Sequence, residues 1–211
     1  MEQDNFTYIE ANASSIVRRR TIHGHGINDA WYVTKPTVEG KQVTCAFYEV
    51  WSSMLARCYS EVLQARYPTY KGCTVAEEWL SFSNFKDWMI KQDWKGKAID
   101  KDVLVHGNKL YSPGTCVFVT GEINNLLLTG RATRGKWPQG VHLNYGGSFQ
   151  AHIGIEGKLK HIGGYDTPEE AEQAYLKAKV ARITEVSHKP ENQYIKAGLL
   201  RHAAQYAQQI N

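Results

Sequence analysis

The sequence predicts an α+β fold with a helical first half, a central segment of short strands, a three-stranded antiparallel sheet packed on one helix, and a C-terminal helix. Two observations carry this prediction. Apolar residues recur at steps of three and four in the first half, and the period changes to two after about residue 137. A length of 211 residues allows one large or two small domains, and we expect two.

Residues 1–45 form the first predicted segment, an arm followed by a loop. It contains the basic run "RRR" at 18–20 and the glycine-rich stretch "HGHGIND". A basic arm of this kind either contacts phosphates or is an ordinary frayed terminus, and the residues leave both interpretations open.

The next predicted segment, residues 46–129, begins with helices. Apolar side chains from Phe47 onward predict one amphipathic helix over 46–60. Thr74 with Glu77 three residues later forms a capping-box pattern and predicts a second helix. Ser83 is the expected cap of a short third helix. The dense aromatic residues in this half predict a packed core.

The stretch "AIDKDVLVHGNKLYSPGTCVFVT" at 98–120 predicts a strand over 98–105, an irregular loop and a second strand. A helix over 121–129 follows, so the order is strand, loop, strand, helix. Residues 130–136 have the composition of a linker.

The two-residue period marks a predicted domain at 137–188. Val141 and Leu143 alternate with His142 and Asn144, the turn "NYGG" follows, and a second turn at "EGK" leads into a third strand. A helix then begins with an N-cap, a proline and a reciprocal glutamate at Thr167, Pro168 and Glu170. Residues 189–211 predict the final helix, with Ile195, Leu199, His202, Tyr206 and Ile210 on one face.

The formal net charge of +4 is mild, but the basic residues are concentrated. Residues 131–164 contain one acid, Glu156, against five basic side chains, which are Arg131, Arg134, Lys136, Lys158 and Lys160. Such a cluster fits a polyanionic partner or a solvated basic loop. The four cysteines form no CxxC pair, so we expect no structural zinc and no disulfide.

No apolar run approaches the roughly 20 residues that span a bilayer, and the start "MEQDNFTYIE" lacks the order of a signal peptide. We therefore expect a cytoplasmic protein with no membrane partner. The sequence has no heptad pattern or other strong dimer signal, and it leaves the oligomeric state open.

The stretch "QGVHLNYGGSFQAHIGIEGKLKHIGGYDTPEEAEQAYLKAK" at 139–179 resembles the DNA-binding domain of plant ethylene-response factors, the Apetala-two type. The shared pattern is a Gly-Val start, an aromatic-x-Ala-x-Ile strand, an Ile-Gly-x-aromatic-Asp-Thr exit and an alanine-rich helix. The resemblance implies that the sheet enters the major groove of double-stranded DNA. It places groove contacts at Gln139, His142, Asn144, Gln150, His152 and His161, with phosphate contacts from the five basic residues named above. The alternative is a scaffold module that has lost DNA binding.

The resemblance extends over most of residues 20–185. "YEVWSSMLARCY", "PTYKGCTVAEEWLSFSNFKDWM" and "DKDVLVHGNKLYSPGTCVFVT" are similar to a phage-encoded family of HNH-like endonucleases with a degenerate His-Me finger. The family pattern places Lys101 or Asp102 at the general base, Tyr111 near the loop asparagine and Thr115 at a metal ligand. Because none is the expected residue, the sequence does not support an intact HNH mechanism.

Neighbouring residues offer a substitute site. Asp100 and Asp102, two apart on a regular strand, would point to the same side and hold Mg²⁺ or Mn²⁺. His106 would then act as base, with Asn108 and Lys101 close by. The alternative is that the two carboxylates cap turns and pair with lysines, while His106 is an exposed loop residue.

Two functions follow as expectations. The first is a phage-type DNA-binding protein that acts as an HNH-like, metal-dependent endonuclease in the bacterial host cytoplasm. The second is a catalytically inactive regulator or antagonist that reuses the fold to bind DNA or a host protein.

Overall fold

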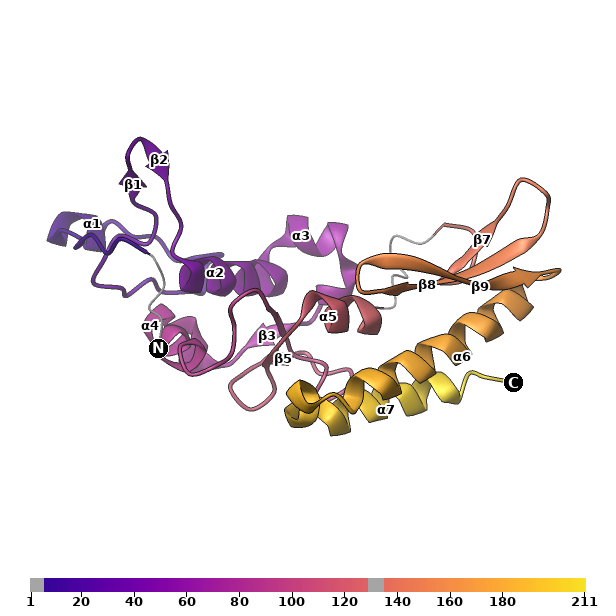
Figure 1. Cartoon of the computed structure of the whole chain (residues 1–211). Helices are drawn as coiled ribbons and strands as arrows, with labels where there is room; N and C mark the ends of the chain where they lie inside the picture. Colours follow the sequence, from indigo (N-terminus) through magenta and orange to yellow (C-terminus); the bar gives the residue numbers. More distant parts are fainter. Residues whose placement is uncertain (1–5, 129–134) are drawn as a thin grey trace. The chain divides into compact units, whose positions relative to one another are not determined.

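The computed structural model describes residues 6–128 and 135–211 (Figure 1). The chain divides into two compact units, and most contacts between residues lie within one unit or the other. The first consists of residues 1–95 and 109–116, and the second of residues 96–108 and 117–211. The segment 46–129, predicted as one module, thus contributes to both units. The mixed α and β content and the three-stranded antiparallel sheet agree with the predicted fold class.

The first unit begins with α1 (Ala13–Val17) and the two-stranded hairpin β1 (Thr37–Val38) and β2 (Lys41–Gln42). Arg19, from the basic run, donates hydrogen bonds to three backbone carbonyl oxygens, those of Asn28, Ala30 and Tyr32, at 2.6–2.9 Å. This arginine therefore links the chain at residue 19 to residues 28–32, which does not fit a frayed terminus at this position.

Helices form most of the rest of the first unit. They are α2 (Ala46–Tyr59), α3 (Glu61–Arg66) and α4 (Phe82–Met89), with the 3₁₀ turns η1 (Pro68–Tyr70) and η2 (Glu77–Leu80) between α3 and α4. The predicted helix over 46–60 is confirmed. The Trp51 indole donates to the Trp79 carbonyl at 2.7 Å, and both side chains are buried among aromatic residues. The predicted aromatic core is therefore present.

Two predicted helix starts were wrong. Thr74 lies in β3 (Thr74–Val75), which pairs in parallel with β5 (Leu110–Tyr111), so its backbone joins a sheet instead of a helix. The α4 helix begins at Phe82 and is capped by Ser81, whose hydroxyl accepts from the Asn84 amide, so Ser83 lies inside the first turn. At Thr74 a strand partner distant in sequence overrides the local capping pattern.

The second unit begins with β4 (Ala98–Asp100), which pairs antiparallel with β6 (Val117–Val119) and is followed by α5 (Gly121–Leu127). The order strand, loop, strand, helix is present. The predicted strand over 98–105 is too long, since the Asp100 carboxylate accepts the amides of Asp102 and Val103 at 2.7 Å each. This Asx-type turn ends the strand at Asp100.

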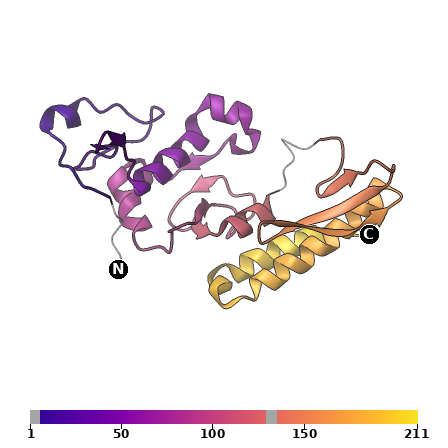
Figure 2. The same ribbon diagram turned by 45° about the horizontal axis from the view of Figure 1, so that its top comes forward.

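The remainder of the second unit is the antiparallel sheet β7 (Val141–Leu143), β8 (Phe149–Ile155) and β9 (Lys158–Tyr165) with α6 (Pro168–Ser187). The capping box of Thr167 and Glu170 is confirmed. The predicted single final helix is instead η4 (Pro190–Ile195) and α7 (Lys196–Ala207). The α6 and α7 helices lie side by side, and α6 packs on one face of the sheet (Figure 2).

Two apolar clusters stabilise this unit. One lies between the sheet and α6, around Ala151, Ile153 and Tyr175. The other joins the strand–helix segment to α6 and α7, and its buried members are Val103, Val119, Ile123, Leu126, Ile183, Val186, Ile195, Leu199 and Ala203. Because α6 belongs to both clusters, it connects the sheet to the loop that follows β4.

Candidate functional site

The face of the sheet opposite α6 is the first candidate site. Directly paired residues of neighbouring strands project to the same face. The pair Val141 and Ala151 is buried against α6, so the next pair, His142 and Gln150, projects away from the helix. His152 pairs with His161 on the same outer face. Four of the predicted groove residues are therefore brought together.

A β-bulge changes the alternation of side chains along the third strand. The register shifts between Ala151 and His152, so Ile162 has no partner opposite it. Lys160 pairs with Ile153 and Lys158 with Ile155, and both isoleucines pack toward α6. The two lysines thus lie on the helix side of the sheet. The pKa of Glu185 on α6 is lowered chiefly by its hydrogen bond with Arg182, and the charge of Lys160 makes a smaller contribution in the same direction.

The side chains of two other predicted groove residues form hydrogen bonds within the protein. The Gln139 amide donates to the Leu128 carbonyl, and its oxygen accepts from the buried Lys179 ammonium. The Asn144 side chain closes the β7–β8 turn through hydrogen bonds with the amide and hydroxyl of Ser148. The outer face is accordingly smaller than the resemblance implies.

The predicted linker is described only from residue 135 onward. Arg131 and Arg134, the two predicted phosphate contacts before that point, lie outside the described residues. Lys136 is exposed, and its ammonium lies 4.6 Å from the centre of the Trp137 ring.

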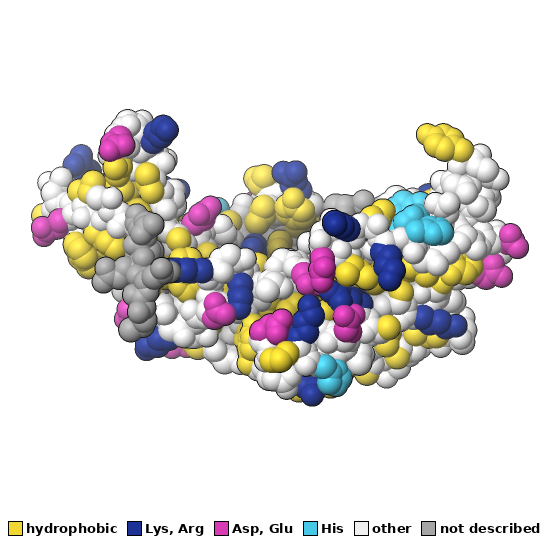
Figure 3. All heavy atoms as spheres, viewed as in Figure 1, with side chains coloured by type: hydrophobic (Ala, Val, Ile, Leu, Met, Phe, Trp, Pro, Cys, Tyr) yellow, Lys and Arg dark blue, Asp and Glu magenta, His cyan; other side chains and the backbone are white. Residues whose placement is uncertain are grey.

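Three histidines form a row across the outer face, and Figure 3 shows histidine side chains gathered over the sheet. The ring of His152 lies 5.4 Å from that of His142 and 5.0 Å from that of His161, measured between centroids. Burial lowers the pKa of His152, and its two histidine neighbours lower it further. Its Nδ1 atom is buried and has no hydrogen-bond partner among the described residues.

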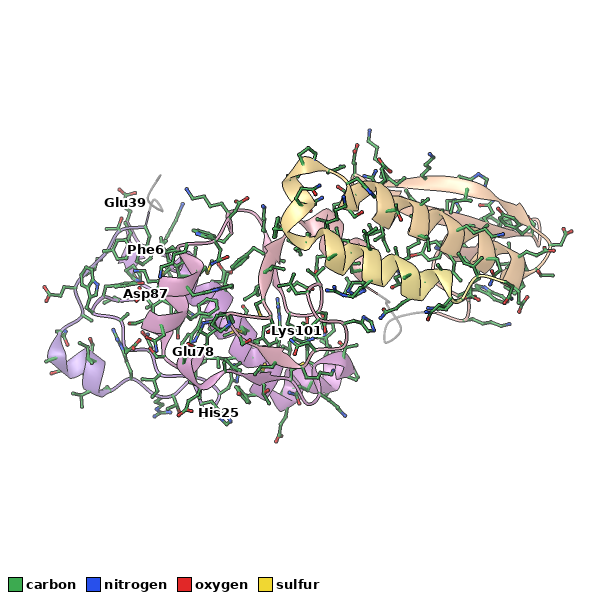
Figure 4. The ribbon with its side chains drawn as sticks, turned by 90° about the horizontal axis from the view of Figure 1, so that it is seen from below. Phe6, His25, Glu39, Glu78, Asp87 and Lys101 are labelled. Atoms are coloured by element: carbon green, nitrogen blue, oxygen red, sulfur yellow. The ribbon has the colours of Figure 1, made fainter. Side chains whose placement is uncertain are left out.

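The loop after β4 is the second candidate site. Lys101, which Figure 4 labels, is 5% exposed. Its ammonium forms a 2.5 Å ion pair with Asp102. The Asn108 amide donates to the Lys101 carbonyl at 3.0 Å and closes the loop. Because the strand ends at Asp100, the expectation that Asp100 and Asp102 share one side of a regular strand is wrong.

His202 on α7 completes this loop site and was not among the predicted site residues. Its ring lies 5.1 Å from that of the exposed His106, and its Nε2 is 3.4 Å from the Asp102 carbonyl oxygen. Burial lowers the pKa of His202, and the charge of His106 acts in the same direction. The available signal was a single histidine on the apolar face of the predicted final helix.

In this arrangement both aspartates of the loop already have partners within the protein. One oxygen of Asp100 is occupied by two backbone amides, and Asp102 is neutralised by Lys101. Within residues 6–128 and 135–211, no three His, Cys, Asp or Glu side chains are grouped as metal ligands. A Mg²⁺ or Mn²⁺ ion bound at Oδ2 of Asp102 would have to displace the Lys101 ammonium from that oxygen.

The other two positions of the family pattern belong to the first unit. Tyr111 is buried in β5, and this burial raises the pKa of its phenol. The Thr115 hydroxyl donates to the Leu110 carbonyl and is 2.8 Å from the Ser112 hydroxyl. Both side chains therefore have local structural contacts.

All four cysteine side chains are buried. Among the helices that the structure describes, none combines the length and the apolar composition needed to span a bilayer. Comparisons of the chain with protein-family models, with curated proteins and with solved structures gave no match.

Proposed function

We propose that this protein binds double-stranded DNA through the outer face of its three-stranded sheet. The observation that carries the proposal is the division of the sheet, with α6 packed on one face and a row of polar side chains on the other. The major groove admits a two-stranded ribbon, some proteins read DNA with the strands of a sheet, and side-chain amides form hydrogen bonds with base edges. The resemblance of residues 139–179 to a groove-binding domain supports the same assignment.

The test measures binding of the full chain to a library of DNA duplexes. His142→Ala or Gln150→Ala should relax the sequence preference by about 1–3 kcal/mol at the contacted positions. Lys177→Ala, which removes an exposed lysine from α6 on the opposite side of the sheet, is the matched control and should leave the preference unchanged. A preference that survives in both face variants would contradict the proposed surface.

Phosphodiester cleavage is a second candidate, favoured by the pair of His106 and His202 beside two carboxylates. Here His106 is the general base, because it is exposed, whereas His202 is buried and positions it. Plasmid DNA incubated with the protein in Mg²⁺, in Mn²⁺ and in EDTA would reveal nicks or breaks. His106→Asn and Asp102→Asn should abolish cleavage and retain binding, and cleavage by both variants at the rate of the unmodified protein would exclude this site.

One observation favours the inactive regulator: Asp100 accepts backbone hydrogen bonds and Asp102 forms an ion pair, both within the loop itself. In that case the loop is structural, and the same plasmids stay intact under all three conditions while DNA remains bound. Retention of a bacterial host protein by the intact chain would then identify what the regulator acts on.

A further inference from the structure

The outer face of the sheet has an electrostatic property that the proposed DNA binding does not explain. The described side chains that project from this face are His142, Gln150, His152, Leu159 and His161, and none is a lysine or arginine. Affinity for DNA comes largely from cationic contacts with phosphates. A neutral face of this kind would supply little of that attraction.

Protonation of the histidines would give this face a positive charge. The three imidazoles come from three different strands, β7, β8 and β9, and their ring centroids are separated by 5.4 Å and 5.0 Å along the row. Histidine is the side chain whose ordinary pKa allows a change of charge between about pH 5 and 8. Full protonation would convert an uncharged surface into one with three positive charges.

Among the described residues of the sheet and of α6, the other charged groups near the row lie toward α6. Lys158 and Lys160 of β9 lie on the α6 side of the sheet, and Glu156 in the β8–β9 turn lies 3.8 Å from Arg182 of α6. The other charged groups of α6 near the sheet, Lys179 and Glu185, also lie beyond the opposite face. Tyr145, in the β7–β8 turn, is the titratable group of that turn, and its phenol is fully exposed.

The middle histidine resists protonation in the protein alone. The Nδ1 atom of His152 is buried and without a hydrogen-bond partner among the described residues, and a charged neighbour stands on either side of it when the row is protonated. Its lowered pKa has the same causes, burial first and then the two neighbouring histidines. A polyanion placed over the row reverses this balance, because it stabilises each added positive charge.

We propose that His142, His152 and His161 form a proton-controlled anion-binding row, so that DNA binding by the sheet takes up protons and strengthens as the pH falls below neutrality. This inference rests on the proposed DNA binding and specifies how it is regulated. By linkage, any group that gains a proton in the complex makes the affinity depend on pH. The row is then the source of the phosphate attraction that the outer face otherwise lacks.

The test compares the affinity of the full chain for a rhodamine-labelled duplex between about pH 7.5 and pH 5.5, where histidine titrates, in EDTA and at constant ionic strength. The affinity of the unmodified protein should increase about tenfold or more over this interval, since each proton taken up contributes up to about tenfold per pH unit. The triple variant His142→Gln, His152→Gln, His161→Gln should lose most of this increase. His188→Gln, which removes an exposed histidine at the end of α6, should retain it.

Calorimetry in two buffers of different ionisation enthalpy supplies an independent readout. The unmodified protein should take up protons on binding DNA near pH 6.5, and the triple variant should not. If the triple variant does not fold, as judged by circular dichroism, the double variant at the exposed residues His142 and His161 replaces it. An affinity that is independent of pH, or equally dependent in the variants, would overturn the proton-controlled row and leave the proposed DNA binding intact. No binding at any pH would overturn both.

Discussion

Gly198 of α7 lies against the Val103 carbonyl oxygen so closely that a Cβ atom at residue 198 would stand 2.0 Å from that oxygen. The contact explains how the C-terminal helix supports the loop after β4. Val103 and Leu199 are buried in one cluster, and the Arg201 guanidinium donates to the Leu104 carbonyl one turn further along α7. The loop of the second candidate site is therefore shaped by a helix from the other end of the unit.

Gly198→Ala should destabilise the protein by about 2–3 kcal/mol, because backbone atoms on both sides must move to admit the methyl group. The matched control is Gly121→Ala in α5, where the added Cβ would meet no atom within 4 Å. That substitution should be neutral or stabilising, since alanine is the better helix former. Urea unfolding of both variants measures the difference, and equal stability of the two would contradict the close contact.

Lys179 is completely buried in α6, and its ammonium donates to the Leu128 carbonyl, the Gln139 side-chain oxygen and the Tyr206 hydroxyl. It also lies 4.1 Å from the centre of the Tyr206 ring. Lys179→Met nearly keeps the length of the side chain but removes the ammonium donor from the Gln139 oxygen and the Tyr206 hydroxyl, while the Leu128 carbonyl keeps its hydrogen bond from the Gln139 amide. We therefore expect a loss of about 1–3 kcal/mol in the free energy of unfolding.

Lys177→Met changes an exposed lysine of the same helix and is the control for Lys179→Met. It should alter stability by less than about 0.5 kcal/mol, because surface substitutions have small effects. Thermal and urea unfolding of the pair should separate the two variants clearly. Equal midpoints would mean that the Lys179 hydrogen bonds add nothing to stability.

Arg19 provides a third prediction, in the first unit. Arg19→Met removes the donor to three backbone carbonyls and should destabilise the N-terminal segment by about 2–3 kcal/mol, as expected for hydrogen bonds from a charged group. Arg20→Met, at the exposed neighbouring position, should have little effect. Limited proteolysis followed by mass spectrometry would detect the change as new cleavage within residues 8–45, and identical digestion of the two variants would refute it.

Local patterns predicted the elements whose partners are near in sequence. The capping box of Thr167 and Glu170 and the alternation across β7 and β8 depend on neighbouring residues, and both are present. The same reasoning failed at Thr74, whose amide bonds to the Lys109 carbonyl, and at Asp100, whose carboxylate terminates its own strand. A capping pattern does not reveal a strand partner that comes more than thirty residues later.

Prediction of the candidate sites from the sequence was limited in the same way. The outer face of the sheet followed from alternation, with three exceptions: a bulge changed the register, Gln139 bonds to Leu128 and Lys179, and Asn144 bonds to Ser148 within its own turn. His202 could not be connected with His106 from the sequence, because only the folding of α7 against the loop brings their rings together. Side-chain roles that depend on such tertiary contacts are not encoded in local spacing.

The buried His202 predicts how stability depends on pH. Burial lowers its pKa in the folded protein below the ordinary value of 6.5. Above that value the ring is neutral in both states. As the pH falls through 6.5, the unfolded chain binds a proton that the folded protein excludes, so the free energy of unfolding decreases until the lower, folded pKa is passed.

Replacing His202 by glutamine should therefore flatten the fall in stability as the pH is lowered from about 6.5 to 5, a window in which histidines titrate. A residual slope should remain, because the pKa of His152 is also lowered. His188→Gln, which removes an exposed ring, is the control and should follow the unmodified protein in parallel. Urea unfolding at several pH values measures all three profiles. If His202→Gln also ran parallel to the unmodified protein, the ring would not be excluding a proton, and its role beside His106 would have to be that of an ordinary solvated imidazole.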